Sequence, residues 1–84
     1  NIGARYEADG LLAEMIFHDP VKAAESYSMA IKYWPTQSVM LRLAGLHDRE
    51  ANGDGDVAVE LYKMAARGGS EAAKTRLAEL MVQY

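Results

Sequence analysis

The sequence predicts an all-α fold built from five short helices that pair as antiparallel hairpins. Apolar residues recur every three or four positions along the chain, and no stretch alternates strictly enough to form a strand. The helices are separated by short connections with proline, glycine or capping side chains, and such connections favour antiparallel neighbours. Two segments also return after 34 or 35 positions, which indicates repeated units.

The start of the second and third predicted helices is marked by proline and a capping side chain. Asp19 can cap the second helix ahead of Pro20, whose missing N–H costs nothing at the first helical position. Pro35 ends that helix, and the Thr36 hydroxyl can cap the third. The five helices are expected over residues 3–16, 20–33, 36–50, 55–67 and 70–83.

The last two predicted helices follow glycine-rich connections. The segment Asn-Gly-Asp-Gly-Asp at 52–56 is a turn with a carboxylate that can cap the fourth helix. Gly68 and Gly69 provide a left-handed helix terminus, after which Ser70 can cap the fifth helix.

The same turn at 52–56 has the oxygen-rich spacing of a calcium loop, which also requires a glutamate at its twelfth position. Counting from Asn52, the twelfth residue is Lys63, and counting from Asp48 it is Val59. Because neither frame supplies the bidentate carboxylate, we predict a turn with a helix cap and no metal site.

The repeat rests on two separate matches. Residues 23–30 share five of eight residues with 58–65, and residues 42–46 share four of five with 76–80. The matches lie on alternate helices, so the unit is a hairpin of about 35 residues that occurs twice, with a fifth helix that begins a third unit. The single repeat domain over 1–84 therefore divides into units 1–35 and 36–69 and a terminal helix 70–84.

The repeated segments carry small and aromatic residues at fixed positions. Ala23, Tyr27 and Ala30, followed by Pro35, resemble the second helix of a tetratricopeptide repeat. The second copy is more similar to the SEL-like subclass of that family. Its matching residues are Asp54, Ala58, Leu61, Tyr62, Ala65, Ala66 and Gly69.

This resemblance implies a right-handed α-solenoid of about two and a half repeats. It also implies a non-catalytic scaffold or adaptor that binds a protein or a peptide. In bacteria, SEL-like proteins include envelope components that support exopolysaccharide secretion, so the resemblance favours the periplasm or cell envelope, and the cytoplasm stays open. The chain begins at Asn1 rather than methionine, and we expect it to be a fragment of a longer repeat array.

Polar residues form a narrow stripe on three of the predicted helices. The stripe of the third helix contains Arg42 and Arg49, and a shift of 34 positions gives Arg76 and Gln83 on the fifth. A shift of 35 positions in the other direction places Gly3, Glu7, Gly10 and Glu14 on the first helix. We expect these stripes to line the concave face, either as ordinary solvated charge or as a partner-binding surface. The candidate partner-binding residues are Glu7, Glu14, Arg42, Arg49, Arg76, Glu79 and Gln83.

Aromatic residues and methionines have two expected roles. Tyr27, Tyr62 and the five methionines are predicted to fill the core beside small alanines. Trp34 stands at a unit boundary beside Tyr33, where it acts either as a staple between units or as an aromatic contact for a partner.

No motif predicts an active site. The sequence has no cysteine, no glycine-rich phosphate loop, no serine elbow and no two-histidine metal spacing. His18 and His47 each precede an aspartate, but adjacent residues on a helix point about 100° apart and do not form a dyad. We therefore predict a protein that is not an enzyme and has no catalytic residue, cofactor or metal. An enzyme or small-ligand binder with a pocket between helices is the alternative.

The composition limits the partners. A formal net charge of −3 disfavours nucleic acid and acidic membrane surfaces, and no apolar run approaches the roughly 20 residues that span a bilayer. The expected partner is a protein or peptide, and the sequence does not define the oligomeric state.

Overall fold

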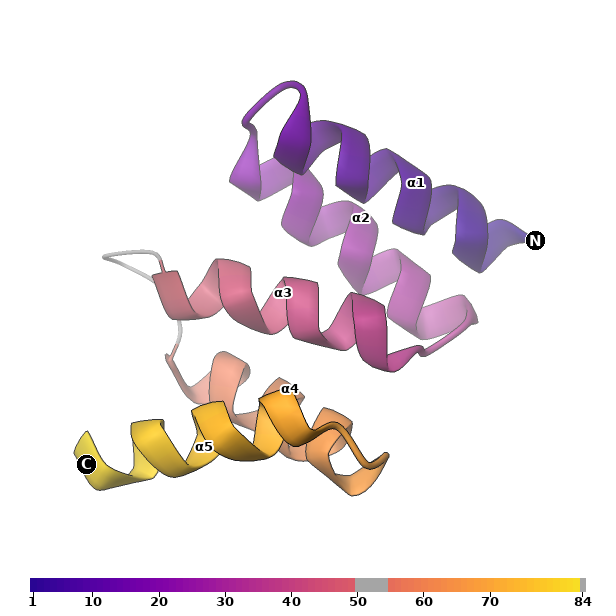
Figure 1. Cartoon of the computed structure of the whole chain (residues 1–84). Helices are drawn as coiled ribbons and strands as arrows, with labels where there is room; N and C mark the ends of the chain where they lie inside the picture. Colours follow the sequence, from indigo (N-terminus) through magenta and orange to yellow (C-terminus); the bar gives the residue numbers. More distant parts are fainter. Residues whose placement is uncertain (50–54, 84) are drawn as a thin grey trace.

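The computed structural model describes residues 1–49 and 55–83, and this part of the chain is all-α, with five helices (Figure 1). The helices are α1 (Ile2–Met15), α2 (Pro20–Tyr33), α3 (Gln37–Arg49), α4 (Gly55–Arg67) and α5 (Glu71–Gln83). The predicted all-α class is therefore confirmed, and the predicted boundaries agree within one residue.

The predicted caps of α2 and α3 are both formed. The Asp19 carboxylate accepts a hydrogen bond of 3.1 Å from the backbone N–H of Lys22, and Pro20 occupies the first helical position. The Thr36 hydroxyl accepts a longer bond of 3.3 Å from the N–H of Val39. These bonds satisfy donors that a helix start leaves without a partner inside the helix.

The connection between α4 and α5 also has its predicted chemistry. Gly69 has a φ of +101°, a conformation that glycine adopts without the steric cost of a side chain. The Ser70 hydroxyl then accepts a hydrogen bond of 3.1 Å from the N–H of Ala73. The turn predicted over 52–56 has its first three residues outside the described part of the chain.

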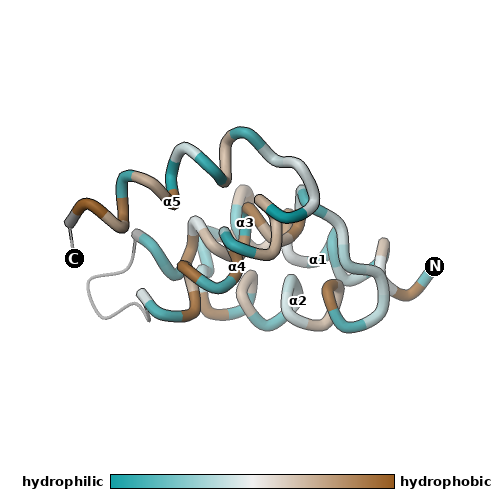
Figure 2. Tube along the Cα trace, turned by 90° about the horizontal axis from the view of Figure 1, so that it is seen from below, coloured by the Kyte–Doolittle hydropathy of each residue, from teal (hydrophilic) through white to brown (hydrophobic). Residues whose placement is uncertain are grey.

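The helices lie in two layers. In Figure 1, α1, α3 and α5 lie toward the viewer and α2 and α4 lie behind them, and Figure 2 shows the same arrangement from below. Each helix packs mainly on the helices that precede and follow it in the chain, most extensively α1 on α2 and α3 on α4. We refer to the surface of α1, α3 and α5 that faces away from α2 and α4 as the inner face.

Small and aromatic side chains fill the space between the two layers. Tyr27 and Tyr62 are buried, as predicted, and alanines surround them at the helix crossings, including Ala23, Ala30, Ala58 and Ala65. Small side chains let the helix axes approach, and each tyrosine ring fills the gap that remains.

The prediction that all five methionines fill the core is wrong for three of them. Met15 and Met81 are more than half exposed and Met64 is 36% exposed. Met15 lies at the end of α1 and Met81 at the end of α5, where there are fewer neighbouring helices to cover them. Met29 and Met40 are half-buried. None of the described helices is both long enough and apolar enough to cross a membrane.

Candidate functional site

Three consecutive helices meet in a cluster formed by Glu14 of α1, Tyr27 of α2 and Arg42 of α3. The Tyr27 hydroxyl donates a hydrogen bond of 2.6 Å to Oε1 of Glu14, and Nη1 of Arg42 lies 3.7 Å from the same oxygen. Tyr27 is fully buried, whereas the side chains of Glu14 and Arg42 are 18% and 36% exposed. The cluster therefore begins in the core and ends on the inner face.

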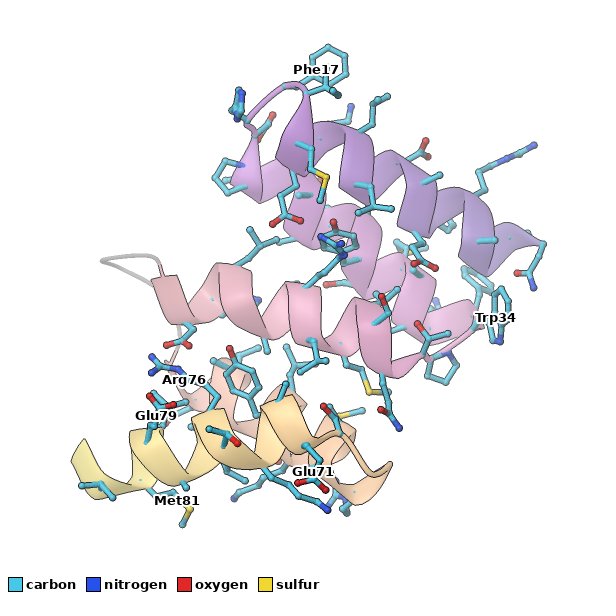
Figure 3. All side chains as sticks on the ribbon, viewed as in Figure 1. Phe17, Trp34, Glu71, Arg76, Glu79 and Met81 are labelled. Carbon is cyan, nitrogen blue, oxygen red and sulfur yellow. The ribbon has the colours of Figure 1, made fainter. Side chains whose placement is uncertain are left out.

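A second cluster has the same chemistry and joins Asp48 of α3, Tyr62 of α4 and Arg76 of α5. The Tyr62 hydroxyl donates to Oδ2 of Asp48 at 3.1 Å. Arg76 donates to both oxygens of Asp48, from Nε at 2.7 Å and from Nη2 at 2.9 Å. Arg76 also reaches Glu79, with Nη1 at 3.4 Å from Oε2, and Figure 3 shows these two side chains next to each other beside α5. This bidentate ion pair between Arg76 and Asp48 is stronger than the single contact between Arg42 and Glu14 in the first cluster.

The two clusters are related by the period of the sequence repeat. The carboxylates Glu14 and Asp48 are separated by 34 positions, as are Arg42 and Arg76, and the tyrosines are separated by 35 positions. The helices α1, α3 and α5 form the inner layer. In both clusters the carboxylate and the arginine come from two successive helices of this layer, and the tyrosine comes from the helix that lies between them in the chain. A carboxylate, a tyrosine and an arginine at this spacing thus come together twice, although the two carboxylates lie outside the matching segments.

The environment of each cluster keeps its tyrosine neutral, and that of the second cluster also holds Arg76 in its charged form. Burial is the main reason that the pKa of Tyr27 is raised above its ordinary value, and the hydrogen bond to Glu14 raises it further. Burial also raises the pKa of Tyr62, together with its hydrogen bond to Asp48. The hydrogen bond to Asp48 raises the pKa of Arg76. The phenols therefore act as permanent hydrogen-bond donors near neutral pH.

The predicted polar stripe on α1 is partly wrong. Gly3 and Gly10 are buried, and a side chain at Gly10 would meet the ring of Tyr27 at 2.5 Å. These glycines permit close packing of α1 on α2, because they have no side chain. In a hydropathy pattern a glycine is easily grouped with polar residues, so the sequence analysis placed both positions in the polar stripe. The equivalent of Glu14 is therefore Asp48, at a shift of 34 positions, and not Arg49.

The other candidate residues have different surroundings. Glu14, Arg42, Arg76 and Glu79 all belong to the two clusters, and Glu7 is half-buried on α1. The side chains of Arg49 and Gln83 lie outside the part of the chain that the structure describes.

Trp34 is the C-cap residue of α2 and follows Tyr33 in the chain, and we refer to Tyr6, Tyr33 and Trp34 as the aromatic group. Trp34 is 48% exposed, and its Cβ lies where a side chain on Gly3 would stand, so it packs within the first hairpin. The ring of Tyr33 stacks on that of Tyr6 with centroids 6.0 Å apart, and Lys32 lies over the Tyr33 ring. The group therefore offers a half-exposed aromatic surface.

The sequence analysis missed this role of Asp48, which it considered only as a neighbour of His47 and as a possible first residue of a calcium loop. The signal was present, because each repeated tyrosine follows a carboxylate by 13 or 14 residues. Two of the pockets in the described part of the chain lie between helices. His47 lines the one between α2 and α3 together with Glu25, and the other lies between α1 and α2. Among the described residues, no three His, Asp or Glu side chains form a group that could hold a metal ion.

No family model, no curated protein and no solved structure matches this chain. The function is therefore inferred from the geometry of the clusters and of the exposed surfaces around them.

Proposed function

We propose that this chain forms a right-handed α-solenoid of SEL-like type and is a non-catalytic scaffold or adaptor that binds a protein or peptide on its inner face. The main support is the double occurrence of the carboxylate–tyrosine–arginine cluster at the period of the sequence repeat. Each cluster joins one helix of the inner layer to the next, which is what a stack of equivalent units requires.

The clusters also hold charged groups at the surface in defined positions. The side chains of Arg42 and Arg76 each remain 36% exposed, and that of Glu79 is 57% exposed. Charged groups that are already fixed lose little conformational entropy when a partner binds, so their arrangement favours specific recognition.

Arg42 is the residue on which we expect a partner to bind most directly. Its nearest contact to Glu14 is 3.7 Å, whereas Arg76 makes two shorter hydrogen bonds to Asp48. A guanidinium carries five N–H donors, so Arg42 can bind a carboxylate of a partner without leaving its cluster. The proposed ligand is therefore a peptide segment that contains Asp or Glu.

The aromatic group around Trp34 offers a second contact for the same function, because half-exposed tryptophans are frequent binding hot spots. A location in a bacterial envelope assembly remains part of the proposal through the family resemblance alone. The alternative is an enzyme or small-ligand binder that uses a pocket between helices, such as the one that Glu25 and His47 line between α2 and α3.

Selection of a displayed random peptide library on the immobilised chain tests the proposal. We expect the enriched peptides to contain acidic residues, and Arg42→Glu to weaken their binding by about tenfold or more. Arg67→Glu is the matched control, because it makes the same charge change at an exposed position on α4, in the other layer.

Circular dichroism of each variant separates loss of binding from loss of folding, and Arg42→Gln provides a milder change at the same position. Unchanged binding by both Arg42 variants, or an equal loss with Arg67→Glu, would contradict the inner face as the binding surface. In that case, loss of binding in Trp34→Ala with an intact helical spectrum would transfer the function to the aromatic group.

A further inference from the structure

The pocket between α2 and α3 combines an apolar wall with two groups that can carry charge. It has a volume of about 310 Å³ and is lined by Val21, Ala24, Glu25, Ser28, Leu46 and His47. Its volume lies at the lower end of the range of about 300–1,000 Å³ that is usual for ligand pockets. An apolar pocket with a few polar groups is the ordinary form of a site for a small group.

The two ionisable groups of this pocket take no part in holding the fold together. Glu25 is exposed and His47 is half-buried, and neither side chain makes a hydrogen bond or an ion pair in the described part of the chain. The Ser28 hydroxyl, in contrast, donates to the backbone carbonyl of Ala24 at 2.8 Å. Lys22 precedes Glu25 by three positions but lines the separate pocket between α1 and α2. The pocket therefore holds a carboxylate that no described side chain pairs.

The second repeat unit shows which group pairs with the equivalent carboxylate. A shift of 35 positions takes Glu25 to Glu60 and Ser28 to Lys63. Nζ of Lys63 lies 3.5 Å from Oε1 of Glu60. The first unit thus keeps the carboxylate and lacks the lysine.

Smaller side chains leave space beside Glu25 in the first unit. Ser28 stands where the second unit has Lys63, and Ala24 stands where it has Val59. Both of these smaller residues line the pocket. Compared with the second unit, the first therefore lacks an aliphatic chain that ends in an ammonium group.

We infer that this pocket binds a primary ammonium group on an aliphatic chain, the group that a lysine side chain and a small alkyl amine share. The ammonium would donate to the Glu25 carboxylate and to an imidazole nitrogen of His47, since it has three N–H donors. The chain would lie on Val21, Ala24 and Leu46, in the way that lysine stems cover apolar surface. This inference does not rest on the proposed binding of acidic peptides to the inner face.

Other ligand classes fit this pocket less well. Among the described residues, no third His, Asp or Glu joins Glu25 and His47 in a group that could hold a metal ion. A carboxylate at the pocket repels an anion, and an uncharged ligand gains no ion pair from it. The charge and the apolar wall together select a cation with an aliphatic chain.

Titration of the isotope-labelled intact chain with pentylamine, at constant pH and ionic strength, tests the inference. We expect the amide chemical shifts to change most around Glu25, Ser28 and His47. Pentanol has the same chain without the charge, and methylamine has the charge without the chain. Both should bind about fivefold more weakly than pentylamine or less well still.

A lysine blocked at its α-amino and carboxyl groups distinguishes the two sources of the ammonium. Binding of blocked lysine at least as tight as that of pentylamine assigns the pocket to a lysine side chain of a polypeptide. Binding of pentylamine without binding of blocked lysine assigns it to a small amine.

Three variants test the role of the carboxylate. Glu25→Gln should weaken pentylamine binding by about fivefold or more. Glu60→Gln is the matched control, because it makes the same change at the equivalent carboxylate and should leave binding unchanged. Ser28→Lys gives the first unit the lysine of the second and should prevent binding. Glu25, Ser28 and Glu60 are not buried, so we expect each variant to fold, and thermal unfolding checks this.

The inference is overturned if neither pentylamine nor blocked lysine binds, if pentanol binds as tightly as pentylamine, or if Glu25→Gln leaves binding unchanged. An equal loss with Glu60→Gln would also overturn it, because it would show attraction to net charge alone. Arg42→Gln, which tests the inner face, should leave amine binding unchanged, so the two proposals can fail separately.

Discussion

At the scale of single residues, Tyr27 and Tyr62 determine how the layers meet. Each buries its ring between helices and places its hydroxyl under a carboxylate, so the polar end of a buried side chain is satisfied. In the described residues, no fully buried side-chain nitrogen or oxygen lacks a hydrogen-bond partner. Each phenol thus adds a specific bond to the nonspecific stabilisation from burial.

These phenols predict a loss of stability at alkaline pH. Their pKa values are raised in the folded state, so their contribution is complete below the unfolded-state pKa of about 10 and is lost as the pH rises toward the folded-state pKa. We expect the melting temperature to fall above about pH 10, and to fall less steeply in the Tyr27→Phe/Tyr62→Phe variant. The double substitution should also cost about 1 kcal/mol for each phenol at neutral pH.

A spectroscopic titration of tyrosinate absorbance provides the check. The wild type should show a late ionisation step that corresponds to two tyrosines, and this step should be missing in the double variant. Absence of the late step from the wild type would show that the two phenols are not held by their carboxylates.

At the scale of helices, residues at equivalent positions of α1, α3 and α5 differ in burial according to where their helix stands in the chain. Leu12, Leu46 and Leu80 occupy the same position on α1, α3 and α5, yet only the last two are buried. The residue is leucine on all three helices, but only α3 and α5 follow a described helix that packs on them.

We therefore predict unequal costs for three identical substitutions. Leu46→Ala and Leu80→Ala should each lower the free energy of unfolding by about 2–4 kcal/mol, and Leu12→Ala by less than about 1 kcal/mol. Urea denaturation of the three variants measures these differences. Equal costs at all three positions would mean that α1 is covered in solution.

The helices and their caps could be predicted from sequence because the signals are local. Asp19, Thr36 and Ser70 each bond to a residue three positions later, so a short segment contains the whole interaction. The side of α1 that packs on α2 was harder to predict from sequence. Gly3 and Gly10 lie on this buried side, and their hydropathy does not reveal it.

At the scale of the whole molecule, the carboxylate–tyrosine–arginine clusters form from residues that are distant in the sequence. Arg76 and Asp48 are 28 residues apart and meet only after α3, α4 and α5 have packed, so spacing alone did not reveal the pair. The period of 34 or 35 positions was visible in sequence, but the bonds that it implies depend on which side of each helix faces its neighbour.

The arrangement also predicts that α5 is the least stable helix. It packs mainly on α4, whereas α3 packs on both α2 and α4. Local opening of α5 breaks few contacts, so its amides should exchange with solvent faster than those of α3. Hydrogen exchange followed by mass spectrometry measures this, and Asp48→Asn should accelerate exchange in α5 without affecting α1. Equal protection of α3 and α5 would contradict this order.

Two double-mutant cycles, measured by urea denaturation, test most directly whether the repeated clusters tie the units together. The first combines Glu14→Ala with Arg42→Ala, and the second combines Asp48→Ala with Arg76→Ala. We expect a favourable coupling in both cycles, larger in the second because Arg76 binds both oxygens of Asp48. The crossed pair, Glu14→Ala with Arg76→Ala, should be additive within about 0.5 kcal/mol. Additivity in both true pairs, or equal coupling in the crossed pair, would contradict the account.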